Sequence, residues 1–403
     1  MKTPISLLCA CLPLLAWAAP YTPKDGGTVI EQLPRRADAT QIALRGLRQQ
    51  LNATPGDLGL ATGLARRYIA LARSETDPRY LGYAQAALAP WWRQAAPPLP
   101  VRLLRATILQ STHQFGPALQ DLDAVIAQEP ANGQAWLTRA TVLTVRGDYA
   151  KATAACARLS ALTTQLVTVT CIANVASVTG RAATSERLLD LTLQRSAGAA
   201  PGLESWALTL LAEMATRRGE TALAEARYKK ALAQQPRDSY LLGAYTDFLL
   251  DQQRPQDVVK LLQDQQRIDA LLLRHALALQ ALPGRQTAFL AAKAELAARF
   301  RAAMQRGDTV HQREQARFAL FLQQDIPAAL QLAQQNWAIQ KEVPDMRILL
   351  EAALAARNYG AARPVLAWIA ANGVEDTALQ RLVRQLGPQD GAKISAAQKA
   401  GVL

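Results

Sequence analysis

Residues of the kinds that form catalytic or metal centres are sparse in this sequence. Among its 403 residues are three histidines, His113, His275 and His311, which lie far apart along the chain. A zinc site needs ligands that converge, and the sequence has no HExxH, nucleophile-elbow or glycine-rich phosphate-binding motif. We therefore expect a protein that is not an enzyme and holds no cofactor and no metal, with His113 solvated in a turn.

The chain begins with the features of a secretory signal over residues 1–18. Lys2 precedes a mostly apolar run, and Ala16-Trp17-Ala18 has the small-x-small pattern of a cleavage site. We expect cleavage after Ala18 and a periplasmic location. The alternative, a lipoprotein box ending at Cys9 or Cys11, fits poorly because apolar residues continue past it.

Cleavage leaves two cysteines, Cys156 and Cys171, in a compartment that oxidises thiols. Helical periodicity places them on neighbouring antiparallel helices, at comparable depth from a turn near residues 160–165. Their Cβ atoms are therefore expected to approach bonding distance, and we predict a disulfide. The alternative is a pair of buried free thiols that pack as small hydrophobic residues.

The helices that carry these cysteines belong to a repeating pattern. Periods of about 34 residues are typical of proteins built from pairs of antiparallel helices. Small residues let the two helices cross closely, and larger apolar residues fill the groove one turn later. The anchor positions separated by 12 residues are Ala106 and Ala118, Ala140 and Ala152, Ala173 and Ser185, Ala212 and Ala224, Thr246 and Val258, and Leu350 and Ala362.

Turn signals separate the two helices of each unit, as at Gly147-Asp148 and Gly219-Glu220. The pattern predicts an all-α fold, a right-handed superhelical solenoid of antiparallel helix pairs. It resembles the tetratricopeptide repeat family, as an exported bacterial member. The motif's small, glycine, aromatic and proline positions are filled in one unit by Ala212, Gly219, Ala224, Tyr228, Ala231 and Pro236. One departure is Arg317, which stands at a small position in the unit that starts at residue 310.

These signals divide the chain into four parts. Residues 1–18 are the signal peptide, and 19–57 form an extended segment with a first helix. Residues 58–376 form the solenoid of about eight or nine units, and 377–403 are a capping helix with a loose tail. The clearest units are 99–132, 133–165, 205–238, 239–272 and 343–376.

The charge balance is basic, with 45 Lys and Arg against 32 Asp and Glu. A net charge of +13 suggests an acidic partner, but colloidal solubility and a high-GC genome explain it as well, since the charge is spread along the chain. We expect no nucleic acid partner, because basic and aromatic residues are not interleaved. We also expect no transmembrane anchor, because no mature segment is long and apolar enough.

The family resemblance implies that the first helix of each unit lines a concave groove that binds a protein or peptide. The implied groove residues are Thr107, Gln110, Gln134, Thr141, Thr144, Thr170, Asn174, Ser177, Thr209, Glu213 and Thr216. Their neutral donors and acceptors suit a peptide backbone, although such residues are also common on solvated surfaces.

The resulting functional hypothesis is a non-catalytic periplasmic scaffold that recruits partners or helps assemble an envelope complex through its groove. The alternative is a subunit of a polysaccharide synthesis or export apparatus, where exported helical repeats also occur.

Overall fold

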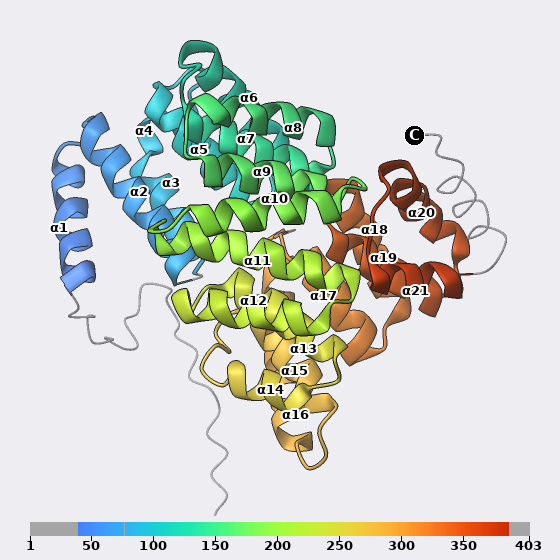
Figure 1. Cartoon of the computed structure of the whole chain (residues 1–403). Coiled ribbons are helices and arrows are strands. Elements are labelled where there is room, and N and C mark those ends of the chain that lie inside the picture. Colours follow the sequence, from blue (N-terminus) through green and yellow to red (C-terminus); the bar gives the residue numbers. More distant parts are fainter. Residues whose placement is uncertain (1–38, 76, 309, 387–403) are drawn as a thin grey trace, which may run out of the picture.

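A computed structural model describes residues 39–75, 77–308 and 310–386, and these residues form helices and turns without a strand (Figure 1). The predicted signal peptide and the predicted tail after residue 386 lie outside the described residues. The first half of the described chain contains α1 (Ala39–Ala53), α2 (Leu58–Ser74), α3 (Arg79–Ala87), α4 (Ala89–Trp92), α5 (Leu99–Ser111), α6 (Phe115–Gln128), α7 (Gly133–Arg146), α8 (Tyr149–Arg158), α9 (Gln165–Ala176), α10 (Ala182–Arg195) and α11 (Pro201–Arg218). The second half contains α12 (Thr221–Gln234), α13 (Ser239–Asp251), α14 (Pro255–Leu261), α15 (Asp269–Gln280), α16 (Gln286–Gln305), α17 (Gln312–Arg317), α18 (Ile326–Ile339), α19 (Val343–Ala355), α20 (Tyr359–Asn372) and α21 (Thr377–Gln385), with a 3₁₀ turn at Leu159–Ala161 and a π-helical turn at Phe318–Gln323.

Consecutive helices pack as pairs, and each pair packs on the next. The pairs with the most extensive contact include α5 with α6, α7 with α8, and α11 with α12. Anchor alanines such as Ala106, Ala118 and Ala140 are buried, so the small side chains sit where helix backbones meet. The stacked helix pairs confirm the predicted all-α solenoid.

Helix starts can be compared with the predicted unit starts. Helices α5, α7, α13 and α19 begin at residues 99, 133, 239 and 343, where units were predicted to begin. Helix α11 begins at Pro201, earlier than the predicted start at 205. Proline suits the first helical turn, because its missing N–H would have no partner there and its φ is preset, which extends this helix toward the N-terminus.

The disulfide partners lie at the junction of two units. Cys156 of α8 and Cys171 of α9 are bonded, with a Cα–Cα distance of 5.6 Å. Both are buried in a cluster with Tyr149, Leu159 and Val175. The bond therefore ties the second helix of one unit to the first helix of the next.

The chain curls until its C-terminal helices touch units far back in the sequence (Figure 1). A set of contacts that we call the clasp joins the two. The backbone N–H of Lys341 donates to the carbonyl of Val145 at 2.8 Å, and the Tyr149 hydroxyl donates to the carbonyl of Lys341 at 3.4 Å. Trp368 Nε1 donates to the Tyr149 hydroxyl at 3.4 Å. Within the C-terminal part, the Lys341 ammonium group lies over the rings of Trp337 and Trp368, at 5.2 and 5.7 Å from their centroids. The clasp closes the helix pairs between α7 and α19 into a ring.

Three turn glycines form an edge on which the C-terminal segment 368–377 lies. They follow the first helices of three consecutive units and all have positive φ, which favours glycine. A Cβ atom at Gly147 would lie 2.3 Å from the Trp368 ring, so the glycine is needed for space as well as for φ. The facing pairs along this glycine edge are Gly147 and Trp368, Gly180 and Gly373, and Gly219 and Thr377.

Candidate functional site

The ring encloses a cavity of about 2370 Å³. First helices of successive units, including α5, α7, α9, α11, α13 and α19, contribute residues to its wall. Ten arginines and twelve carboxylates of the described residues line it. The wall is therefore densely charged but nearly balanced, in contrast to the chain as a whole with its net charge of +13.

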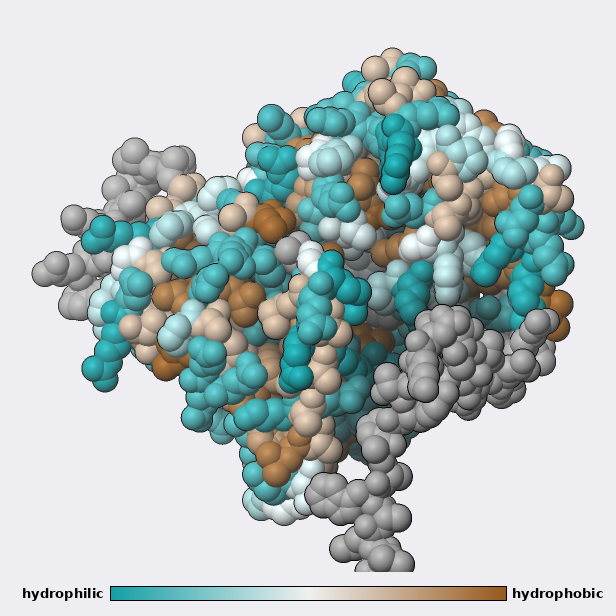
Figure 2. All heavy atoms as spheres, turned by 180° about the vertical axis from the view of Figure 1, so that it is seen from behind, coloured by the Kyte–Doolittle hydropathy of each residue, from teal (hydrophilic) through white to brown (hydrophobic). Residues whose placement is uncertain are grey.

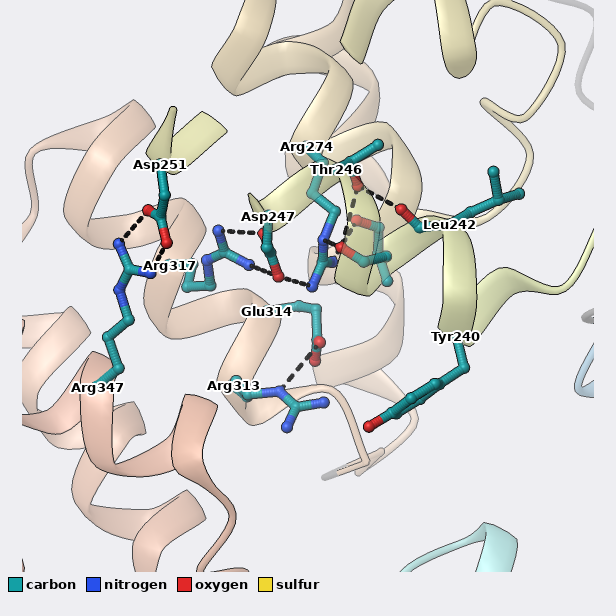
Figure 3. Close-up of polar contacts among 12 residues, drawn as sticks. Tyr240, Leu242, Thr246, Asp247, Asp251, Arg274, Arg313, Glu314, Arg317 and Arg347 are labelled. Atoms are coloured by element: carbon teal, nitrogen blue, oxygen red, sulfur yellow. Dashed lines mark hydrogen bonds and ion pairs between the residues drawn. The ribbon is translucent and has the colours of Figure 1, made fainter. Parts of the chain in front are cut away.

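Asp247 on α13 is held by two arginines from different units (Figure 3). The Arg274 Nη2 atom lies 2.5 Å from one carboxylate oxygen, and the Arg317 Nη2 atom lies 2.9 Å from the other. Burial alone would raise the pKa of Asp247, but the two guanidinium groups outweigh it and hold that pKa well below its ordinary value. Asp247 therefore stays ionised and fixes both arginines in the wall.

Arg317 explains a departure in the repeat pattern. It occupies a position that is small in other units, and its side chain crosses to Asp247, 70 residues earlier in the sequence. The helix adopts π geometry over Phe318–Gln323, directly after Arg317. Local π geometry is frequent at functional sites. The arginine at a position where the repeat pattern expects a small residue was thus the feature of the sequence that marked this part of the cavity wall.

A second ion pair joins α13 to α19. Both oxygens of Asp251 accept from Arg347, each at 2.7 Å, and the Arg347 Nε atom also donates to Glu351 at 2.8 Å. Two parallel hydrogen bonds between a guanidinium and a carboxylate fix their relative orientation. The pair spans the cavity wall between units that are 96 residues apart.

A buried polar network continues this wall to the clasp. Asp345 accepts from Asn336 at 2.8 Å and from Arg313 at 3.3 Å, and Gln340 donates to Asn336 at 3.1 Å. Burial raises the pKa of Asp345 to about 6, although Arg313 acts in the opposite direction. The Gln340 amide nitrogen lies 3.3 Å from Nδ1 of His113.

His113 corrects one expectation. It lies in the predicted turn, with φ of 57°, but it is half-buried against this network and is not simply solvated. Burial, helped by the positive charge of Arg313, lowers the pKa of His113 to about 4. The imidazole is therefore neutral near pH 7.

Six of the eleven predicted groove residues line the cavity, which brings them together on one surface. They are Thr141, Thr144, Asn174, Thr209, Glu213 and Thr216. The other five do not line it: Thr107, Gln110, Gln134, Thr170 and Ser177. A binding role for any of them remains a prediction.

The predicted threonines do not offer free hydroxyl donors. Each donates to the backbone carbonyl four residues earlier on its own helix, as Thr141 does to Leu137 at 3.0 Å and Thr216 to Ala212 at 2.9 Å. Such bonds are a common way for threonine to satisfy its hydroxyl within a helix. The predicted lining consisted of neutral hydrogen-bonding residues, whereas the cavity wall also includes many charged side chains.

Within the described ranges, no group of three or more His, Cys, Asp or Glu side chains is arranged to hold a metal ion. The helices of this part of the chain also include none that is both long and apolar enough to cross a membrane.

Comparison with known proteins does not assign the chain to a family. No family model matches the sequence, and no curated protein matches it. Among solved structures, the chain is similar to a crystal structure of the APC/C hetero-tetramer Cut9-Hcn1, with 11% sequence identity and a TM-score of 0.41 over 89% of this chain and 87% of that chain. A similarity at this level carries no argument about fold or function.

Proposed function

We propose that this protein is a non-catalytic periplasmic scaffold that binds a segment of a partner protein in its central cavity. The observation that carries the proposal is the cavity wall itself. It is assembled by ion pairs between distant units, such as Arg317 with Asp247 and Arg347 with Asp251. Residues that hold each other in place in this way present a preorganised surface, which lowers the entropic cost of binding.

The composition of the wall favours a peptide over a polyanion. Most of its arginines are bonded to carboxylates, as Arg274 and Arg317 are to Asp247, so an anionic ligand would have to displace those carboxylates. A peptide segment with side chains of both signs matches a balanced wall. The face seen in Figure 2 is mainly hydrophilic, with hydrophobic residues scattered among the polar ones.

The periplasmic location is supported by two features. The Cys156–Cys171 disulfide fits an oxidising compartment. The first 18 residues have the pattern of a cleavable signal. Amino-terminal sequencing of protein from a periplasmic fraction should give Ala19 as the first residue, and recovery of the intact chain from the cytosol would contradict this location.

Site-specific photocrosslinking tests the cavity. Benzoylphenylalanine replaces Phe321, which is 37% exposed and lines the cavity, or Leu191, which is 51% exposed on α10 and outside the cavity wall. We expect a partner protein from a periplasmic extract to crosslink at position 321 and much less at 191. A partner that crosslinks only at 191 would overturn the proposal.

The polysaccharide alternative is tested with the same protein. Migration in a native gel that contains alginate, an acidic polysaccharide, reports direct binding. Retardation in this gel, with no protein crosslinked at Phe321, would favour a role in polysaccharide synthesis or export over the scaffold.

A further inference from the structure

We propose that Tyr240 and Glu213 form a subsite in the cavity wall that binds a lysine or arginine side chain of the partner segment. The inference rests on the proposed function and adds the chemistry of the ligand. Tyr240 is the second residue of α13, and Glu213 lies on the neighbouring first helix, α11. Both line the cavity.

The ring of Tyr240 is unusually open. Tyr240 as a residue is 62% exposed, whereas Tyr228 nearby is 1% exposed and its ring stacks on that of Tyr245 at 5.2 Å between centroids. Tyr240 is one of the residues that line the cavity, so part of its exposed surface faces that space. Figure 3 shows the side chain pointing away from α13, on the same side as Arg313 and Glu314. An exposed aromatic face of this kind attracts cations through its negative quadrupole.

Glu213 supplies a carboxylate beside this ring. Its Oε1 atom accepts from the Tyr240 hydroxyl at 2.7 Å, which orients the two groups together. Burial raises the pKa of Glu213, and the negative charge of Glu342 adds to this effect. Arg217 opposes it by its charge, but its guanidinium donates to the carbonyl and the hydroxyl of Ser177, at 3.4 and 3.1 Å.

The pair therefore differs from the rest of the charged wall. Asp247 and Asp251 already bind arginine side chains of this chain, whereas the bond to Glu213 comes from a neutral hydroxyl. An incoming guanidinium or ammonium group would lie over the Tyr240 ring and donate to the carboxylate. A charge-assisted hydrogen bond and a cation–π contact would act together on such a group.

The test uses fluorescein-labelled peptides and fluorescence anisotropy with the full mature chain. The probe is a nine-residue peptide of alternating alanine and arginine, with blocked termini. Matched peptides carry citrulline or glutamate in place of arginine, so that the charge changes and the length does not. We expect the arginine peptide to bind about tenfold more tightly than the citrulline peptide, against the overall positive charge of the protein.

Substitutions assign that preference to the two residues. Glu213→Gln and Tyr240→Ala should each weaken binding of the arginine peptide by about fivefold or more, and Tyr240→Phe should lose less because it keeps the ring. Glu129→Gln, which removes one carboxylate from an exposed position outside the cavity wall, is the control and should bind as the wild type does. Thermal melts followed by circular dichroism confirm that each variant is folded.

Equal affinity for the arginine and citrulline peptides, or an unchanged affinity in both Glu213→Gln and Tyr240→Ala, would overturn the subsite. Tighter binding of the glutamate peptide would also overturn it. The subsite and the scaffold can be rejected independently. A partner crosslinked at Phe321 but insensitive to Glu213→Gln removes the subsite alone, whereas a partner crosslinked only at Leu191 removes the cavity as the binding surface.

Discussion

At the scale of single residues, two titratable groups beside the clasp, His113 and Asp345, change the stability of the fold in opposite directions as the pH falls. The pKa of His113 is lowered by burial and that of Asp345 is raised by burial. Both belong to one hydrogen-bonded network through Gln340 and Asn336. The pH dependence of stability therefore has to be measured as a difference between matched proteins.

His113→Asn should flatten the acid side of the stability profile. The folded-state pKa of His113, about 4, lies below its ordinary value of 6.5. Above pH 6.5 the neutral imidazole imposes no penalty on folding. As the pH falls, protonation favours the unfolded state, and the free energy of unfolding of the wild type decreases by about 3 kcal/mol at pH 4. Asparagine tolerates the positive φ at this position and does not titrate. Urea unfolding at pH 7 and pH 4 measures the change, and an identical pH dependence in both proteins would contradict it.

Asp345→Asn should show the opposite sign. The raised pKa of Asp345, about 6, means that the folded state binds a proton more tightly than the unfolded state. The cost of the buried charge is fully present above pH 6 and is relieved as the pH falls toward 4. The wild type should therefore gain stability relative to Asp345→Asn between pH 7 and pH 4. Parallel curves for the two proteins would show that this carboxyl group titrates normally.

At the scale of elements, the disulfide compensates for a weak helix. Helix α9 contains the β-branched run Val167-Thr168-Val169-Thr170, whose helical propensity is low. The double variant Cys156→Ala/Cys171→Ala should lower the free energy of unfolding by about 3 kcal/mol, as expected for the loss of a crosslink that closes a short loop. Wild-type protein reduced with dithiothreitol provides the comparison. A free energy of unfolding that changes in neither case would contradict a structural role for the bond.

The helix pairs could be predicted from the sequence, whereas the cavity wall could not. Helix pairs follow from local spacing, because anchors such as Ala140 and Ala152 lie 12 residues apart and must meet where two helices cross. The cavity wall depends on which units face each other after the chain curls, and a local pattern does not contain that information. Asp247 finds Arg317 at a separation of 70 residues.

Five of the eleven predicted groove residues lie outside the cavity wall for a related reason. The repeat register placed Thr107, Thr170 and Ser177 in the groove, but neighbouring units and helix crossings bury them outside the cavity wall. Periodicity gives the face of a helix, whereas the curvature of the whole array decides how much of that face stays open. Arg317 stood out in the sequence as an arginine in place of a small anchor, but the repeat pattern did not indicate Asp247 as its partner.

At the scale of the whole molecule, the glycine edge controls whether the ring closes. Gly147→Ala should destabilise the protein by about 2 kcal/mol, because alanine is strained at a φ of 81° and its Cβ would meet the Trp368 ring. We also expect a larger radius of gyration by small-angle X-ray scattering, since segment 368–377 would have to move away.

Gly198→Ala is the matched control for this prediction. Gly198 has nearly the same φ, 83°, but a Cβ atom there would meet nothing within 4 Å. It shares the backbone strain and lacks the contact with the C-terminal segment. The radius of gyration should stay unchanged in Gly198→Ala, and equal effects of the two variants would show that the edge contact is unimportant.

The clasp also imposes a topological condition on any partner. In the part of the chain that the structure describes, the ring is closed by the main-chain hydrogen bond between Lys341 and Val145, by side-chain contacts and by the glycine edge. A partner chain would therefore enter end-first, or sideways after these contacts break. A segment near a chain terminus can thread, whereas an internal loop held between folded domains must wait for the ring to open. Association would then be limited by opening and not by encounter, so the rate of binding would respond to the stability of the clasp even where the final affinity does not.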